Sequence, residues 1–166
     1  MTEINKAQLK EKYQFEDFFA EVTQEQRAAV TNIHETMTGS GYKNKVEKKA
    51  SGFLVAYTHP KTKRSILNLF FRKDGLQARI YAENHKRYAD FIYNLPEDME
   101  TQVAKATNCK RFLTPPECSD TCSAGYDILV RGNQYRKCRY SCFHFKANTK
   151  SLPVITEFIE QEKAFR

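Results

Sequence analysis

The sequence is poor in glycine, with only six among its 166 residues. Loops that cradle phosphate groups need closely spaced glycines, and the patterns G-x-x-x-x-G-K-[ST], G-x-G-x-x-G and G-x-S-x-G are all missing. An H-E-x-x-H pair is missing too, and the four histidines (His34, His59, His85 and His144) are not spaced as metal ligands. We therefore expect a binding protein rather than an enzyme.

Long apolar segments are also missing from the sequence. No run of 18 or more apolar residues occurs, and the first residues, MTEINKAQLKEKYQ, lack the apolar core of a secretory signal. We therefore expect a cytoplasmic protein without a membrane partner. In a reducing compartment, clustered cysteines bind metals or carry out redox chemistry more often than they form structural disulfides.

Positive charge is present in excess and is unevenly distributed. The net charge is +7, and residues 101–166 carry 11 basic and 6 acidic side chains, whereas residues 1–50 carry eight of each. A basic surface attracts phosphates and acidic partners whatever their sequence. A merely solvated basic surface is the alternative interpretation of the same charge.

Apolar residues at helical spacing predict three helical regions. The first begins after Thr23, which forms the T-x-x-Q pattern of a capping box with Gln26. The second covers residues 84–106. The third begins at Ser151 and has Pro153 in its first turn, where the missing N–H costs little.

Alternating apolar residues predict strands in the middle of the chain, at residues 53–57, 66–72 and 76–81. The Asp74-Gly75 pair between the last two is a hairpin signal. Because residues 53–57 are apolar at every position, we expect this strand to be covered on both faces.

The stretch CSDTCSAGYDILVRGNQYRKCRYSC holds four of the five cysteines as two C-x-x-x-C pairs, Cys118/Cys122 and Cys138/Cys142. Zinc prefers four sulfur or nitrogen ligands, which proteins usually supply as two short pairs. The spacing therefore predicts a structural zinc ion bound by these four cysteines.

The residues between the two pairs strengthen this prediction. Residues 126–131 alternate as a strand, residues 134–138 return, and Gly132-Asn133 predicts a two-residue turn with glycine first. Such a hairpin would bring the second pair beside the first. The expected architecture is one α+β domain over residues 1–166, with an antiparallel sheet packed by helices and a C-terminal cysteine-rich metal-binding hairpin within residues 109–146.

Other interpretations of the cysteines stay open. Four thiolates also suit an iron–sulfur cluster, for which Cys109 is a fifth candidate ligand. A redox pair is a second alternative, although the thioredoxin-type C-x-x-C spacing is missing. Buried structural thiols are a third, and they fit Cys109 best. His144 could replace one sulfur, but we expect an ordinary surface or core histidine.

Basic and aromatic residues interleave around the second cysteine pair. Single-stranded nucleic acid is bound by this combination, in which the charges contact phosphates and the rings stack on bases. We therefore expect a non-enzymatic protein that recognises a macromolecular partner, either nucleic acid or an acidic protein. A small-molecule sensor domain with an aromatic pocket and a thiol or iron–sulfur redox protein are the alternatives. The candidate partner-binding residues are Arg131, Tyr135, Arg136, Lys137, Arg139 and Tyr140.

The stretch GFLVAYTHPKTKRSILNLFFRKDGLQARIY, followed by an expected helix, lies within residues 26–106. The order of elements in this region resembles the YjbR/YdhG/CyaY-like α+β domains of uncharacterised bacterial proteins. The resemblance implies a helix that leads into a twisted antiparallel sheet, with a second helix packed on that sheet. It rests on a pattern rather than a motif and covers about half the chain, so it assigns no functional residue.

Overall fold

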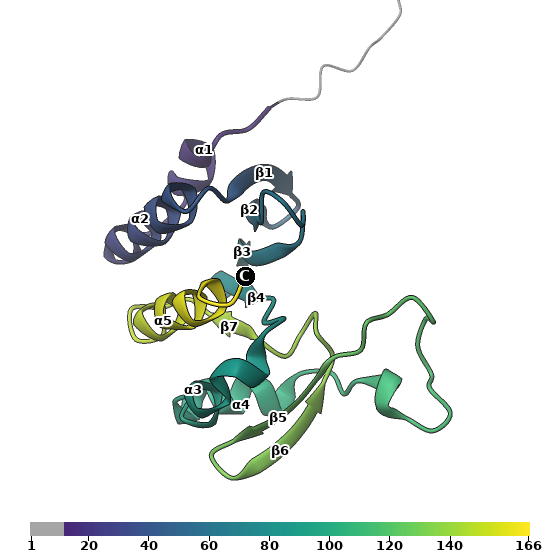
Figure 1. The fold of residues 1–166 in the computed structure, drawn as a ribbon. Helices are drawn as coiled ribbons and strands as arrows, with labels where there is room; N and C mark the ends of the chain where they lie inside the picture. Colours follow the sequence, from purple (N-terminus) through teal and green to yellow (C-terminus); the bar gives the residue numbers. More distant parts are fainter. Residues whose placement is uncertain (1–11) are drawn as a thin grey trace, which may run out of the picture.

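The structure, a computed structural model, describes residues 12–166. Helices and strands are mixed along the chain, and Figure 1 shows their arrangement. The elements are α1 (Phe15–Phe19), α2 (Gln24–Gly39), β1 (Lys43–Lys49), β2 (Gly52–Thr58), β3 (Ser65–Arg72), β4 (Gly75–Ile80), η1 (His85–Tyr88), α3 (Ala89–Tyr93), α4 (Glu97–Lys105), η2 (Lys110–Phe112), β5 (Tyr126–Val130), β6 (Asn133–Lys137), β7 (His144–Lys146) and α5 (Leu152–Lys163).

The main sheet has five antiparallel strands in the order β1-β2-β3-β4-β7, which confirms the α+β fold with an antiparallel sheet. Strands β5 and β6 form a separate two-stranded sheet, and we call them the ribbon. None of the helices within residues 12–166 has the length and apolar character that a membrane span requires.

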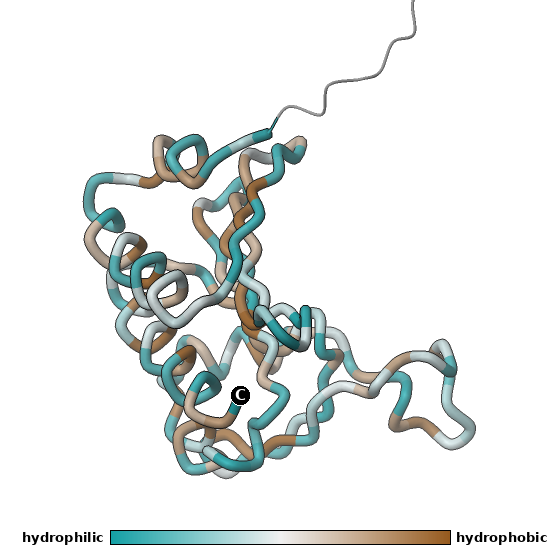
Figure 2. The backbone as a smooth tube through the Cα atoms, turned by 45° about the horizontal axis from the view of Figure 1, so that its top comes forward, coloured by the Kyte–Doolittle hydropathy of each residue, from teal (hydrophilic) through white to brown (hydrophobic). Residues whose placement is uncertain are grey.

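Helices α1, α2 and α5 lie along one face of the sheet (Figures 1 and 2). The side chains of Val55, Leu69 and Ala78 occupy adjacent register positions on this face, and all three are fully buried. The hydroxyl of Tyr57 is hydrogen-bonded to His34 of α2 at 2.9 Å, which fixes which side of β2 meets the helices. The main core therefore lies between the sheet and these three helices.

No helix of residues 12–166 lies on the other face of the sheet, which corrects the expectation for β2. Leu54 and Ala56 point to this side, and both are only half-buried. An apolar run usually indicates a strand buried on both faces. Here the side chains of Leu54 and Ala56 instead lie on an open surface.

The ribbon forms as predicted, but its turn lies one residue earlier. Val130 pairs with Asn133, so the two turn residues are Arg131 and Gly132 rather than Gly132 and Asn133. Both turn residues have positive φ, +47° and +88°, as a type I′ turn requires. This turn matches the twist of the strands, so the ribbon accepts a strained non-glycine residue at Arg131.

The helix ends agree with prediction in position but not in every contact. Thr23 is the N-cap of α2, yet its hydroxyl donates to Gln26 Oε1 at 2.9 Å and the reciprocal capping box is not formed. Gln26 instead donates its side-chain amide to the Ala147 carbonyl at 2.6 Å. The C-terminal helix begins after Ser151 with proline in its first turn, as predicted.

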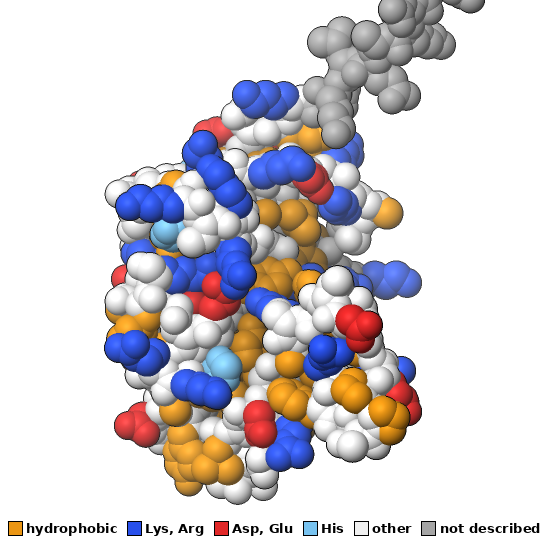
Figure 3. All heavy atoms as spheres, turned by 45° about the vertical axis from the view of Figure 1, so that its right-hand side comes forward, with side chains coloured by type: hydrophobic (Ala, Val, Ile, Leu, Met, Phe, Trp, Pro, Cys, Tyr) orange, Lys and Arg blue, Asp and Glu red, His pale blue; other side chains and the backbone are white. Residues whose placement is uncertain are grey.

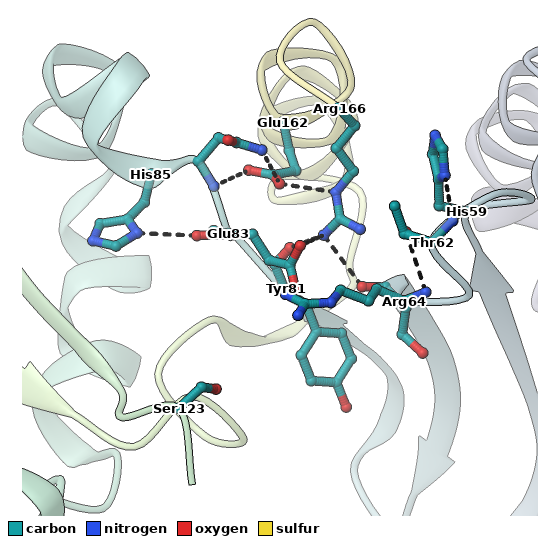
Figure 4. A network of polar contacts seen from close by, with 12 residues as sticks. His59, Thr62, Arg64, Tyr81, Glu83, His85, Ser123, Glu162 and Arg166 are labelled. Atoms are coloured by element: carbon teal, nitrogen blue, oxygen red, sulfur yellow. Dashed lines mark hydrogen bonds and ion pairs between the residues drawn. The ribbon is translucent and has the colours of Figure 1, made fainter. Parts of the chain in front are cut away.

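A buried ion pair connects the end of α5 to the sheet (Figure 4). Glu162 has no exposed surface, and its Oε1 accepts a hydrogen bond from Arg166 Nε at 2.9 Å. Glu162 also accepts hydrogen bonds from Asn84 and Tyr88. The Arg166 guanidinium donates to the backbone carbonyls of Ser65 and Tyr81, at the end of the strands.

The buried histidines predict how stability changes with pH. Burial lowers the pKa of His34, His85 and His144 below the ordinary value of 6.5. Below pH 6.5 the unfolded chain therefore binds more protons than the folded protein, and the free energy of unfolding decreases as the pH falls through the folded pKa values. The decrease is at most about 1.4 kcal/mol per histidine and pH unit.

Urea unfolding at pH 7.5 and pH 5.5 measures this effect, because acidic groups titrate mainly below that interval. We expect lower stability at pH 5.5, and a smaller difference between the two conditions in His144→Gln. Equal or greater stability of the unmodified protein at pH 5.5 would contradict the prediction.

Candidate functional site

The face of the sheet opposite the helices is the main candidate for a binding surface, and we call it the open face. Figure 3 shows a hollow with hydrophobic side chains on its floor and Lys and Arg side chains around it. Strand alternation and register place on this face Lys43, Lys45, Glu47 and Lys49 of β1, Leu54, Ala56 and Thr58 of β2, Asn68, Phe70 and Arg72 of β3, Gln77 and Arg79 of β4, Tyr81 after it, and His144 and Lys146 of β7.

Positive charge dominates the open face. Glu47 is the only acidic side chain that the strands of residues 12–166 place on this face, and its carboxylate is already shared by Lys45 at 2.6 Å and Lys49 at 2.5 Å. The two lysines lower the pKa of Glu47 to about 2. Lys146 pairs with Asp74 at the end of the hairpin, at 2.9 Å. The remaining basic groups of the face have no such compensation.

Arg72 and Arg79 lie over the same aromatic ring. Their guanidinium carbons are 5.6 and 5.2 Å from the centroid of the Phe70 ring, which is only 7% exposed. Neither arginine forms an ion pair with a carboxylate of residues 12–166. Both guanidinium charges at this ring therefore stay uncompensated, and an anion in contact with them would be stabilised.

A row of unsatisfied polar atoms crosses the open face beside this pair. Asn68, Arg79 and His144 are neighbours in register on β3, β4 and β7. Asn68 Oδ1, Arg79 Nε and His144 Nε2 are buried, and each lacks a hydrogen-bond partner in the described chain. Each buried atom of this kind lowers the free energy of unfolding by about 1–3 kcal/mol. Such atoms mark places where water, an ion or a ligand can supply the missing hydrogen bond.

The charge of the row favours an anion. Burial lowers the pKa of His144, and the nearby positive charges of Arg79 and Arg72 lower it further. The imidazole is therefore neutral near pH 7, while the two guanidinium groups stay charged. The net local charge is positive, and the matching ligand group is a phosphate or carboxylate.

Two hollows lie on this side of the molecule. The first, about 190 Å³, is lined by Lys49, Arg72, Arg79, Phe70 and their neighbours. The second, about 270 Å³, brings basic and aromatic side chains together at the end of β4, where the Tyr81 and Tyr140 rings are 6.2 Å apart. The residues that line the second hollow are Arg64, Ser65, Tyr81, Glu83, Ser123, Arg139 and Tyr140.

The carboxylate of Glu83 offsets part of the positive charge in the second hollow. This carboxylate pairs with Arg64 at 3.0 Å and with Arg139 at 3.6 Å, and Figure 4 shows it among these polar contacts. Arg139 also donates to the Ser123 hydroxyl. The Tyr140 ring stays 57% exposed, so it offers a free face for stacking at the edge of the open face.

Arg139 and Tyr140 are thus the two predicted partner-binding residues that reach the candidate site. On the ribbon, Arg131 pairs with Glu100 of α4 at 3.3 Å, and the Tyr135 hydroxyl donates to the same carboxylate at 2.9 Å. These contacts attach the ribbon to α4.

The other two predicted residues also have partners within the fold. Arg136 pairs with Asp127 across the ribbon at 3.1 Å. Lys137 is buried, and its ammonium group donates to the Ala104 and Ala106 carbonyls and to Asn108. Their role in binding a partner stays a prediction.

The cysteines of the first predicted pair lie in an exposed segment between η2 and β5. We call residues 110–125 the cysteine loop; it projects on the side of the sheet away from the helices (Figure 2). Cys118 is exposed and Cys122 is half-buried. The neighbouring Cys122 thiol and, to a lesser extent, desolvation raise the pKa of the Cys118 thiol.

The cysteines of the second pair lie close to the core. Cys138 is half-buried after β6, whereas Cys142 is fully buried in the core cluster, and this burial raises the pKa of its thiol. Cys109 is also buried, as expected, and is 7% exposed. Within residues 12–166 no three His, Cys, Asp or Glu side chains are gathered into a metal-binding group.

Gly125 holds the cysteine loop against the ribbon. A Cβ atom added at Gly125 would overlap the Lys137 carbonyl and lie 3.1 Å from Cys109 Sγ. We expect Gly125→Ala to lower the free energy of unfolding by about 1–3 kcal/mol, because overpacking displaces the backbone. Chemical denaturation measures the change.

Gly39→Ala at the end of α2 is the matched control, because no atom lies within 4 Å of the added Cβ. We expect this control to be neutral or slightly stabilising. Equal effects of the two substitutions would show that the close approach at Gly125 does not matter.

Comparisons with known proteins do not identify the candidate site. Comparisons of the chain with protein-family models, with curated proteins and with solved structures return no match. The resemblance of residues 26–106 to the YjbR/YdhG/CyaY-like domains therefore stays a prediction. Any function must be argued from the residues of the chain itself.

Proposed function

We propose that the protein is a non-enzymatic binding module whose open face binds single-stranded nucleic acid. The observation that carries the proposal is the pair Arg72 and Arg79, which share the Phe70 ring and have no carboxylate partner in the described chain. A phosphate between the two guanidinium groups would supply the missing negative charge.

The size of the first hollow favours one group of a larger molecule. A volume of about 190 Å³ is below the roughly 300–1,000 Å³ of sites that enclose whole small molecules. It suits a single phosphate or carboxylate. A polyanion that continues across the sheet would use the hollow and the lysines of β1 together, which favours nucleic acid over a small metabolite.

Aromatic side chains lie where bases can stack. Tyr81 is half-buried on the open face, and Tyr140 lies beside it with its ring exposed. A base stacked on such a ring contributes about 1–3 kcal/mol without demanding a particular sequence. Five strands spaced about 4.8 Å apart give a surface roughly 20 Å wide, which accommodates several nucleotides.

Fluorescence anisotropy with a labelled single-stranded oligonucleotide tests the proposal. We expect binding whose logarithm of affinity falls linearly with the logarithm of salt concentration, with a slope of about −0.7 for each phosphate contacted. A duplex of the same length should bind more weakly, because its bases are not free to stack. Absence of binding at 50 mM salt, or an affinity that does not depend on salt, would contradict the proposal. Binding of an acidic protein but not of the oligonucleotide would make an acidic protein the partner of the open face instead.

We also propose a structural metal, most simply zinc, within residues 109–146. The support is the donor set, since five thiols occur within residues 109–142 and two of them, Cys118 and Cys122, lie in the cysteine loop. A structural zinc ion contributes about 10–16 kcal/mol at neutral pH, against a net stability of about 5–15 kcal/mol for a whole domain. An iron–sulfur cluster is the alternative group for the same donors.

A further inference from the structure

Backbone pairing places Cys109 next to the second cysteine pair. The Cys109 N–H donates to the Arg136 carbonyl at 3.0 Å, and the Cys138 N–H donates to the Thr107 carbonyl at 2.8 Å. Asn108 and Lys137 form an antiparallel bridge between these two contacts. Residues 107–109 therefore act as a short third strand beside the end of β6.

Strand alternation then puts Cys109 and Cys138 on the same side of this pairing. Asn108 and Lys137 occupy the other side, where the Lys137 ammonium donates to Asn108 Oδ1 at 2.9 Å. Residues that are diagonal neighbours across an antiparallel pair are close enough for their side chains to share a ligand. Sequence spacing gives no hint of this neighbourhood, because 28 positions separate the two cysteines.

The cysteine loop returns to the same place. The Gly125 N–H donates to Cys109 Sγ at 3.2 Å, and Gly125 rests on the Lys137 carbonyl. The same loop carries Cys118, which is exposed, and Cys122, which is half-buried.

Cys142 occupies a different environment. Its side chain is fully buried in the core cluster, and its N–H donates to the Cys138 carbonyl at 2.9 Å. A side chain enclosed on all sides by core residues leaves no space beside it for an ion and three further ligands. Cys142 is therefore better suited to packing than to metal binding.

We infer that the structural zinc ion is bound by Cys109, Cys118, Cys122 and Cys138, and that Cys142 is a core residue. This inference rests on the proposed structural metal and is independent of nucleic-acid binding by the open face. Each thiol loses its proton as its Zn–S bond forms, and four thiolates close the site to catalysis. Binding of the ion draws the exposed Cys118/Cys122 segment onto the side of the ribbon that carries Cys109 and Cys138.

Metal analysis of the full chain, purified without added metal, tests the ligand set. We expect about one zinc per chain in the unmodified protein, since four thiolates complete one tetrahedral site. Cys109→Ser and Cys138→Ser should lose most of this zinc, whereas the matched variant Cys142→Ala should keep it. Circular dichroism of each variant establishes whether it is folded.

A second measurement needs no variant. Brief alkylation under native conditions, followed by mass spectrometry, should leave the exposed thiol of Cys118 protected in the zinc-loaded protein and modified after chelation. Cys118 labelling that is indifferent to zinc would overturn its role as a ligand. Zinc that survives Cys109→Ser and is lost in Cys142→Ala would overturn the ligand set alone. A metal-free unmodified protein would overturn the structural metal as well, and a brown protein containing iron would overturn the assignment to zinc.

Discussion

Replacing both Arg72 and Arg79 with alanine is expected to weaken binding of a single-stranded oligonucleotide by about 100-fold or more. A hydrogen bond to a charged group contributes about 1.5–3 kcal/mol, and each 1.4 kcal/mol corresponds to about tenfold in affinity. The two guanidinium groups lie over the same ring and lack carboxylate partners in the described chain, so both are free to contact a phosphate. The slope of log affinity against log salt should also decrease by about 1.4, for two phosphate contacts on a single strand.

Lys105→Ala combined with Lys150→Ala removes the same charge from outside the open face. Both lysines are exposed, one at the end of α4 and the other before α5. The long-range attraction between the protein and the oligonucleotide decreases equally in the two double variants. A difference between their affinities therefore reports a specific contact. Equal losses of affinity would mean that net charge attracts the nucleic acid and that the open face is not its site.

Glu162→Gln is expected to lower the free energy of unfolding by about 3 kcal/mol, because it leaves the Arg166 guanidinium buried without its main counter-charge. The glutamate side chain has no exposed surface, and Arg166 Nη1 already lacks a partner in the described chain. Asn84 and Tyr88 would lose an ionised acceptor at the same time. Urea denaturation followed by circular dichroism measures the change.

Glu160→Gln is the matched control on the same helix. Glu160 pairs with Lys163 at 3.2 Å but remains about half exposed. Exposed ion pairs contribute about 0–1 kcal/mol, so this variant should be nearly as stable as the unmodified protein. A similar small effect of Glu162→Gln would show that the buried network does not hold α5 in place.

The sequence predicted the helices and central strands because their signals are local. Apolar spacing after Thr23 and after Ser151, and alternation on both sides of Asp74-Gly75, depend on neighbours a few residues away. The ribbon was predicted for the same reason, although its turn was placed one residue late. Glycine shows that a positive φ is needed, but it does not show whether it occupies the first or the second turn position.

The open face could not be derived from the sequence in the same way. Arg72 and Arg79 stand at polar positions of two predicted strands, and that alternation is the signal that could have drawn attention to them. Their meeting over Phe70 depends on register, and the third member of the row, His144, is 65 positions beyond Arg79. Only the return of β7 to the edge of β4 brings it there.

By itself the sequence determined the fold class, most element positions, the basic charge and the clustering of cysteines, because each depends on composition or short-range order. The tertiary structure decided which face of the sheet stays uncovered, which polar atoms remain without partners and which cysteines are neighbours. All three of these features depend on pairing between strands that are distant in the chain, and no local sequence pattern predicts that pairing. Cys142 shows the difference: its spacing suits a metal ligand, while its place in the packed core suits an apolar side chain.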